Sequence, residues 1–141
     1  MTGVYVLIVE LESPGMIGVG RWPCIHFRSG FYVYVGSALS GIEPRLARHL
    51  GNKQKCHWHI DYLLDRATIR KVVYALTGER KECSLARELA LRLPSVPGFG
   101  SSDCRCPSHL FFSPDFATLQ KDVIAAFREA GLRPVVEKLA V

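Results

Sequence analysis

The sequence lacks several features that would define its class at once. It has no apolar run approaching the roughly 18 residues that a membrane helix requires. It has no basic segment followed by an apolar stretch near Met1, the pattern that directs secretion. It also has no low-complexity tract, internal repeat or interdomain linker. These absences exclude a membrane-spanning protein and favour a soluble, cytoplasmic, single domain over residues 1–141.

Cysteine is present, but in an odd number. Five cysteines without a secretion signal predict reduced thiols or metal ligands instead of a disulfide framework. The 141 residues are 48% hydrophobic, enough for a substantial core. The formal charge of +5 and the pI of about 9.1 suit a polyanionic partner such as a nucleic acid.

One stretch stands out as a strand that leads into a helix. Residues 30–36 are aromatic and β-branched and end on a glycine, which predicts a strand. Pro44 fits the first turn of a helix that starts near residues 42–44. Arg45 and His49 are four residues apart and therefore share one side of this helix. A cation and an imidazole beside a strand that carries Tyr34 suit an anionic substrate.

The remaining segments predict a mixed α/β (α+β) domain built on an antiparallel sheet. Residues 3–11 form a nearly continuous apolar run, typical of a central strand buried on both faces. Residues 16–21 suggest a second strand that forms a hairpin with the first through residues 12–15. We further expect strands at 69–76 and 110–112, helices at 57–64 and 79–93, and a last helix that starts at Ser113-Pro114 and stops at Gly131.

The helix at 79–93 contains one acid on its apolar side. At about 100° per residue, Glu82 falls near the middle of the arc of Leu85, Ala86 and Leu89, whereas Glu88 falls well outside it. An inward carboxylate is costly unless it meets a cation, a metal or hydrogen-bond donors. The alternative is a partly exposed first-turn glutamate that the helix dipole favours.

Several of these residues match a known pattern. Gly3-Val4-Tyr5 and Tyr34-Val35-Gly36, with Ser37, Arg45 and His49, resemble the two half-motifs and the helix of the GIY-YIG nuclease superfamily. Three later runs resemble a prokaryotic branch of it that is sometimes fused to endonuclease III-type glycosylases: His57-Trp58-His59-Ile60-Asp61, Glu82-Cys83 and residues 98–106. The resemblance implies a small antiparallel sheet flanked by helices, with its core at about 3–93 and an extra C-terminal loop and helix at 94–141.

The resemblance also implies a divalent-metal-dependent endonuclease. It makes Glu82 the ligand of Mg²⁺ or Mn²⁺ and Arg45 the cation that steadies the scissile phosphate, as a bidentate guanidinium can. Tyr5 would accept a proton from the attacking water or orient it, and Tyr34 would hydrogen-bond water or phosphate. His49 would position Tyr5 or share its proton, since a tyrosine that titrates near 10 needs help to act as a base.

The chain departs from the superfamily pattern in two places. The distance between Tyr5 and Tyr34 indicates an inserted hairpin at residues 12–30. Many superfamily members carry an asparagine after the glutamate, and residues 83–141 contain none. Ser102 and Asp103 are candidates to replace it.

A long loop at residues 95–109 holds further polar candidates, because loops of this length in compact domains tend to be functional. We expect it to wall the site and to bring Asp103 or His109 near the metal. Cys104, Cys106 and His109, with Cys83 or a histidine, also suggest zinc, but Cys-x-Cys is not the spacing of structural zinc knuckles, so the sequence disfavours zinc. Lys53, Lys55, His57 and His59 are candidates for phosphate contact, although a solvated face or a helix cap explains them as well.

Two functions are therefore expected. The resemblance implies the first, a DNA endonuclease, specific for structure or strand and connected with repair, with DNA favoured over RNA and a repair protein as a possible partner. The second is a non-catalytic accessory domain that binds nucleic acid, which the positive charge and the missing asparagine favour.

Overall fold

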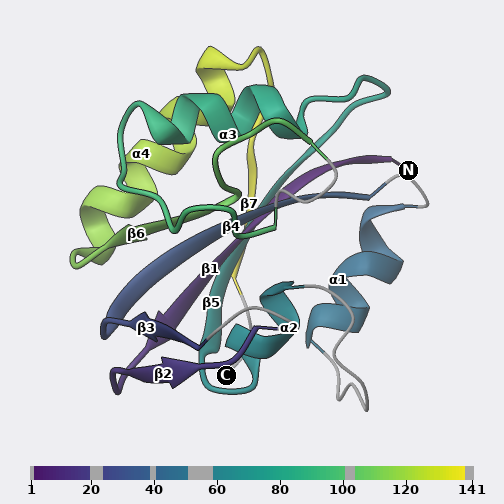
Figure 1. Ribbon diagram of the computed structural model, residues 1–141. Coiled ribbons are helices and arrows are strands. Elements are labelled where there is room, and N and C mark those ends of the chain that lie inside the picture. The colour runs from purple at the N-terminus through teal and green to yellow at the C-terminus, as the bar shows by residue number, and fades with distance from the viewer. Residues whose placement is uncertain (1, 20–23, 39–40, 51–58, 101–103, 139–141) are drawn as a thin grey trace.

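Figure 1 shows a computed structural model of the chain, which describes all residues except 1, 20–23, 39–40, 51–58, 101–103 and 139–141. A five-stranded antiparallel sheet lies at the centre, in the order β6-β4-β1-β5-β7. Its strands are β1 (Gly3–Leu11), β4 (Gly30–Ala38), β5 (Thr68–Leu76), β6 (Leu110–Ser113) and β7 (Val135–Lys138). The predicted α+β class with an antiparallel sheet is confirmed.

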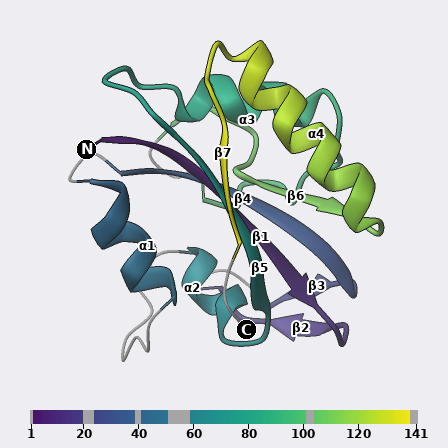
Figure 2. The same cartoon turned by 180° about the vertical axis from the view of Figure 1, so that it is seen from behind.

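Within the described residues, four helices cover the two faces of this sheet (Figures 1 and 2). On one side lie α1 (Ile42–Leu50) and α2 (His59–Leu64), and on the other lie α3 (Glu82–Ala90) and α4 (Phe116–Glu129). None of the helices in the described part of the chain is long and apolar enough to cross a membrane.

Strand β1 divides its side chains between the two layers by the period of two that every strand has. Tyr5, Leu7 and Val9 belong to one core cluster, under α2 and the loop between α3 and β6. This cluster also contains Ile60, Leu63 and Phe99. Val4, Val6 and Ile8 belong to the cluster under α3 and α4, which also contains Leu85, Leu89, Val123 and Phe127. Both faces of β1 are therefore buried, as its continuous apolar sequence predicts.

The segment between β1 and β4 forms a separate hairpin, β2 (Gly15–Ile17) with β3 (Ile25–Phe27). This confirms the inserted hairpin predicted for residues 12–30. The predicted hairpin between residues 3–11 and 16–21 is wrong. Strand β1 already pairs with β4 on one edge and with β5 on the other, so it offers no free edge to β2.

Two helix ends differ from the sequence-based expectation. The last helix begins at Phe116 and not at Ser113-Pro114, because the Asp115 side chain is the N-cap and accepts a hydrogen bond from the Thr118 N–H at 2.9 Å. It stops as predicted, with Gly131 at φ +78° after the C-cap Ala130. Helix α3 spans Glu82–Ala90 and is shorter than the predicted 79–93.

The C-terminal region is more than an addition to a finished core. Strand β6 pairs with β4 at one edge of the sheet, and β7, which the sequence pattern did not predict, pairs with β5 at the other edge. The sheet thus uses residues from both ends of the described chain. This arrangement holds the loop between α3 and β6 against the end of β4, where the backbone N–H of Val35 donates to the His109 carbonyl at 2.9 Å.

Candidate active site and metal centre

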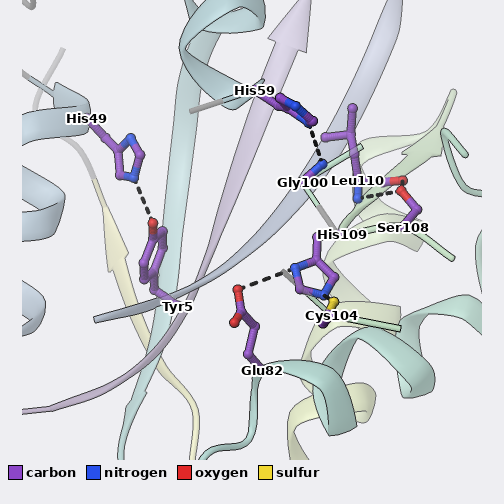
Figure 3. Close-up of polar contacts among 9 residues, drawn as sticks. All are labelled: Tyr5, His49, His59, Glu82, Gly100, Cys104, Ser108, His109 and Leu110. Atoms are coloured by element: carbon purple, nitrogen blue, oxygen red, sulfur yellow. Dashed lines mark hydrogen bonds and ion pairs between the residues drawn. The ribbon is translucent and has the colours of Figure 1, made fainter. Parts of the chain in front are cut away.

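A buried tyrosine and a buried histidine meet between β1 and α1. The Tyr5 hydroxyl lies 2.7 Å from His49 Nε2, and Figure 3 shows the tyrosine pointing at the imidazole. The two side chains come from segments 44 residues apart, and they are 0% and 5% exposed. The contact is a short hydrogen bond within the core, with a direction set by the histidine tautomer.

Tyr34 and Arg45 complete this group, which we call the tyrosine–histidine site (Tyr5, Tyr34, Arg45 and His49). The Tyr34 ring lies 6.5 Å from the Tyr5 ring and 6.4 Å from the His49 ring. Burial raises the pKa of Tyr5 to about 12, although the charge and hydrogen bond of Arg45 act in the opposite direction. Burial also raises the pKa of Tyr34 well above its usual value. Both hydroxyls are therefore protonated at neutral pH.

Gly36 explains why the second half-motif ends in glycine. It lies directly opposite Tyr5 in the β1–β4 register. A Cβ at this position would sit 2.4 Å from Cζ and from the hydroxyl oxygen of Tyr5. Because Gly36 has no side chain, the Tyr5 ring can occupy this space, and its hydroxyl can contact His49.

Glu82 opens onto a cleft of about 400 Å³ at the end of the sheet. It is the first residue of α3, and its side chain is 30% exposed. Among the described residues, the lining of this cleft does not include Tyr5, Tyr34 or His49. The Glu82 charge nevertheless contributes to the raised pKa of Tyr5 and of Tyr34, so the cleft lies within electrostatic range of the tyrosine–histidine site.

The lining of the cleft combines oxygen donors with two cations. The oxygen donors include Glu82, Glu79, Ser37 and Thr77, and the cations are Arg80 and Lys81, of which Lys81 lies 3.4 Å from the Glu79 carboxylate. Mg²⁺ prefers oxygen ligands and is usually held by one or two carboxylates together with waters and substrate phosphates. Glu82 offers one such carboxylate, and Ser37 lines the same cleft.

His109 touches Glu82 from the other side. Its Nδ1 lies 3.3 Å from Glu82 Oε1, and its Nε2 lies 3.5 Å from Cys104 Sγ (Figure 3). The imidazole is nearly fully buried, and Nδ1 is within ion-pair distance of the carboxylate but forms no hydrogen bond. The sequence placed His109 in the wall of the site, and the structure places it in contact with Glu82.

Three thiols gather at the same imidazole. Ligand atoms of Cys83, Cys104, Cys106 and His109 all lie within 4.8 Å of one another, and we call these four residues the Cys3His cluster. The cluster can hold a metal ion, and three sulfurs with one nitrogen suit zinc and not Mg²⁺ or Mn²⁺. Burial raises the pKa of Cys83, and it raises that of Cys106 to about 12.

This cluster runs against the sequence argument that disfavoured zinc. Cys104 and Cys106 are too close in sequence to form a knuckle of their own. Cys83, which the sequence offered as one of several possible further ligands, joins them from the first turn of α3. Spacing rules describe ligands from one segment and do not apply to a site assembled from two.

Of the other predicted site residues, some lie at or near the Glu82 cleft and others lie outside the described part of the chain. Ser37 lines the Glu82 cleft. His59 does not line the cleft, but its Nδ1 accepts a hydrogen bond at 2.9 Å from the N–H of Gly100, which does. This bond ties the loop to α2, and burial lowers the pKa of His59. Five predicted residues lie outside the described part of the chain, namely Lys53, Lys55, His57, Ser102 and Asp103.

Sequence reasoning missed one buried ion pair that positions the site. Asp61 on α2 is fully buried and binds the Arg48 guanidinium of α1 through two contacts, at 3.0 and 3.1 Å. Arg48 directly precedes His49, so this bidentate pair fixes the turn of α1 that carries the imidazole. The signal was available, because Asp61 lies between the apolar Ile60 and Leu63 of a short helix.

A family profile described as a domain of unknown function, DUF123, matches residues 4–132. The match covers most of the chain, from β1 through α4, and it includes both the tyrosine–histidine site and the Cys3His cluster. This chain is a member of the DUF123 family. Comparisons with curated proteins and with solved structures gave no match.

Proposed function

We propose that this protein is a divalent-metal-dependent endonuclease of the GIY-YIG type that hydrolyses phosphodiester bonds in DNA. One observation carries the proposal: the Tyr5 hydroxyl meets His49 Nε2 at 2.7 Å, with the Arg45 guanidinium beside the same hydroxyl. A proton acceptor, a phosphate-binding cation and a hydroxyl relay are thereby concentrated at one end of the sheet. The preference for DNA, the specificity for structure or strand, and a role in repair rest on the family resemblance.

The proposed proton route starts from the protonated state of Tyr5. A tyrosine with a pKa of about 12 is a poor base by itself, because its hydroxyl is protonated and carries no negative charge at neutral pH. It can accept a proton from the attacking water while it passes its own proton to His49 Nε2. The water oxygen then bonds to phosphorus, the bond to the leaving sugar oxygen breaks, and that oxygen takes up a proton from solvent, to which the His49 imidazolium later releases its own.

The remaining groups act on charge and position. Arg45 binds two non-bridging phosphate oxygens, whose charge grows in the transition state. Glu82 holds the divalent ion, which supplies Lewis-acid neutralisation when it is bound. Because Tyr5 is 0% exposed, the route requires that substrate binding opens a path from the Glu82 cleft to its hydroxyl.

The same burial favours the second candidate, a non-catalytic module that binds nucleic acid. In that case Tyr5 and His49 are a packed core pair, and the net charge of +5 supplies the affinity. The two candidates differ in their dependence on Glu82. A nuclease requires this carboxylate for cleavage, whereas a binding module requires only the cations.

The deciding experiment measures cleavage of labelled single strands, duplexes, flaps, junctions and RNA in Mg²⁺ and in Mn²⁺. Wild type is compared with Glu82→Ala and with Glu88→Ala, a matched control on the same helix whose carboxylate pairs with Arg92 at 3.2 Å. We expect metal-dependent cleavage in wild type and Glu88→Ala, and a loss of at least about 100-fold in Glu82→Ala with DNA affinity retained.

Binding without cleavage would favour the accessory module. Cleavage that survives in Glu82→Ala would remove this residue from the mechanism and with it the proposal. Arg45→Ala separates the candidates again, since a nuclease should lose rate and a binding module should lose salt-dependent affinity.

A further inference from the structure

We infer that the Cys3His cluster is a structural zinc site and that its histidine positions Glu82. The ligands are the thiolates of Cys83, Cys104 and Cys106 and the Nε2 atom of His109. The zinc ion would join the first turn of α3 to the loop that leads into β6. The zinc site does not depend on the proposed nuclease function, whereas the importance of positioning Glu82 rests on it.

The spacing of the ligand atoms fits a tetrahedral ion. With Zn–S near 2.3 Å and Zn–N near 2.05 Å, a tetrahedral angle places the sulfur and nitrogen about 3.6 Å apart. Cys104 Sγ and His109 Nε2 are 3.5 Å apart. All four ligand atoms lie within 4.8 Å of one another, so an ion at their centre needs only a small contraction of the thiols.

The fold holds the ligands in place without help from a metal. The His109 N–H donates to the Phe99 carbonyl at 2.8 Å, and the Leu110 N–H donates to Ser108 Oγ at 2.9 Å. Cys106 packs against the core cluster under α3 and α4. The loop is thus tied to the core on both sides of its ligands, which lowers the entropic cost of closing the site.

The two nitrogens of His109 would have separate tasks. When Nε2 binds zinc, the ring proton must lie on Nδ1, and Nδ1 is the atom 3.3 Å from Glu82 Oε1. A metal-bound histidine characteristically donates its other N–H to a carboxylate, which fixes the orientation of both groups. Zinc would thereby turn a buried Nδ1 that makes no hydrogen bond into a donor aimed at Glu82.

The first test is the metal content of the full chain. Protein purified without chelators should contain a single zinc ion per chain by elemental analysis, and replacement by Co²⁺ should give the intense visible bands of a tetrahedral thiolate site. Cys106→Ala should lose the ion, whereas Cys24→Ser should keep it, since Cys24 is an exposed thiol outside the cluster. The cobalt spectrum is measured on wild type, so it holds even if a cysteine variant fails to fold.

Three results would overturn the zinc site. They are a metal-free wild type that takes up neither zinc nor cobalt, an octahedral cobalt spectrum, and a disulfide among Cys83, Cys104 and Cys106 in freshly purified protein.

The second test examines the link from His109 to Glu82. Outer partners of a metal-bound histidine typically change metal affinity by about 10–100-fold when they are removed. Glu82→Ala should therefore weaken zinc binding by about 10-fold in competition with a chelator. Glu82→Gln, which keeps an oxygen acceptor, should restore most of this loss, and Glu88→Ala should have no effect.

A spectroscopic measurement addresses the tautomer directly. In the zinc-bound protein, ¹⁵N spectra of the imidazole rings should show His109 with a proton on Nδ1 and none on Nε2. The Nδ1–H resonance should shift in Glu82→Ala and stay unchanged in Glu88→Ala. A proton on Nε2, or zinc affinity that is the same in Glu82→Ala and wild type, would refute the positioning role.

The outcomes separate this inference from the proposed function. Full zinc content and the Nδ1–H tautomer without any cleavage of nucleic acid would uphold the zinc site and remove the nuclease. Metal-dependent cleavage by a protein that binds no zinc would do the reverse.

Discussion

The two faces of the sheet place chemistry in different surroundings. Under α1 and α2, the polar groups form pairs inside the core: Tyr5 with His49, and Arg48 with Asp61. Under α3 and α4, the core is made of aliphatic side chains and phenylalanine, and the polar groups gather at its margin, where Glu82 meets the Cys3His cluster. Both faces have an apolar core. The first face adds polar pairs within that core, and the second has ligands that converge from two segments at its margin.

This difference indicates which functional groups can change partners. A buried pair such as Tyr5–His49 is rigid, because removal of either member leaves polar atoms in a low-dielectric interior. Glu82 is 30% exposed and opens onto a cleft, so it can exchange water, metal or phosphate for its present contacts. In the proposed mechanism, the rigid face supplies the proton relay and the open margin receives the substrate.

The largest loss of stability should come from Arg48→Ala on the α1–α2 face, which removes the guanidinium that binds the fully buried Asp61. Loss of one partner from a buried ion pair costs about 3 kcal/mol of unfolding free energy, because the Asp61 carboxylate stays in the core without its bidentate guanidinium. Urea denaturation measures the loss, and Arg66→Ala, at an exposed arginine just after α2, serves as the control. A cost as small as that of the control would show that the α1–α2 face does not depend on its ion pair.

Gly36→Ala should disrupt the tyrosine–histidine site, because the added methyl group would collide with the Tyr5 ring. The added Cβ would lie 2.4 Å from Tyr5, whose ring is fully buried and cannot swing into solvent. We expect a loss of about 2 kcal/mol, typical of an overpacked core. Gly78→Ala is the matched control, since a Cβ there meets nothing within 4 Å. Equal denaturation midpoints for the two variants would refute the packing of Tyr5 on Gly36.

Tyr5→Phe should have a smaller effect on stability, about 1 kcal/mol, because it removes the hydroxyl with its hydrogen bonds to His49 and Arg45 and leaves the ring in place. It also allows the pKa of Tyr5 to be measured from the difference between the ultraviolet titrations of wild type and variant. The difference should show no tyrosinate at the ordinary value of 10.0 and should rise near 12.

The sign of the linked stability follows from this raised pKa. The native state keeps its proton longer than the unfolded chain, so the contribution of Tyr5 is fully present below pH 10 and is lost as the pH rises toward 12. A difference titration centred at or below 10 would place Tyr5 in a more polar setting than its burial indicates.

The smallest effect should come from Asp115→Asn on the opposite face. Hydrogen bonds from the Thr118 side chain and backbone lower the pKa of Asp115, so its ionised form stabilises the start of α4. This stabilisation is present above the ordinary pKa of 3.8 and disappears as the pH falls through the lowered value. Thermal denaturation of wild type and variant should therefore differ at pH 7 and converge in strong acid. A difference in melting temperature that stays constant with pH would exclude the Asp115 charge as the source of the stabilisation.

Local sequence predicted most of the elements, because each has its own pattern. The apolar run of residues 3–11 predicted a doubly buried strand, and the pattern from Gly30 through the turn near Gly41 predicted a strand followed by a helix. Glycine at 131 predicted the end of α4. The short β7 has no alternation that distinguishes it from a loop, and it becomes a strand only because β5 offers an unpaired edge.

The candidate sites divide in the same way. Arg45 and His49 share one helix, so their spacing was sufficient to place them together. The Cys3His cluster combines Cys83 on α3 with three ligands within the long loop that leads into β6, and the spacing of Cys104 and Cys106 alone pointed away from zinc. The importance of Asp61 appears only once α1 and α2 are side by side.

The sequence by itself determined the type of most elements, the two layers into which β1 divides its side chains, and Arg45 and His49 as neighbours on one helix. These follow from periodicity and from local conformational preferences, which act over a few residues. Only the tertiary structure decided that Tyr5 reaches His49 across Gly36 and that His109 stands between Glu82 and three thiols. Such contacts join segments far apart in the chain, and their geometry depends on strand register and loop anchoring, which no local pattern encodes.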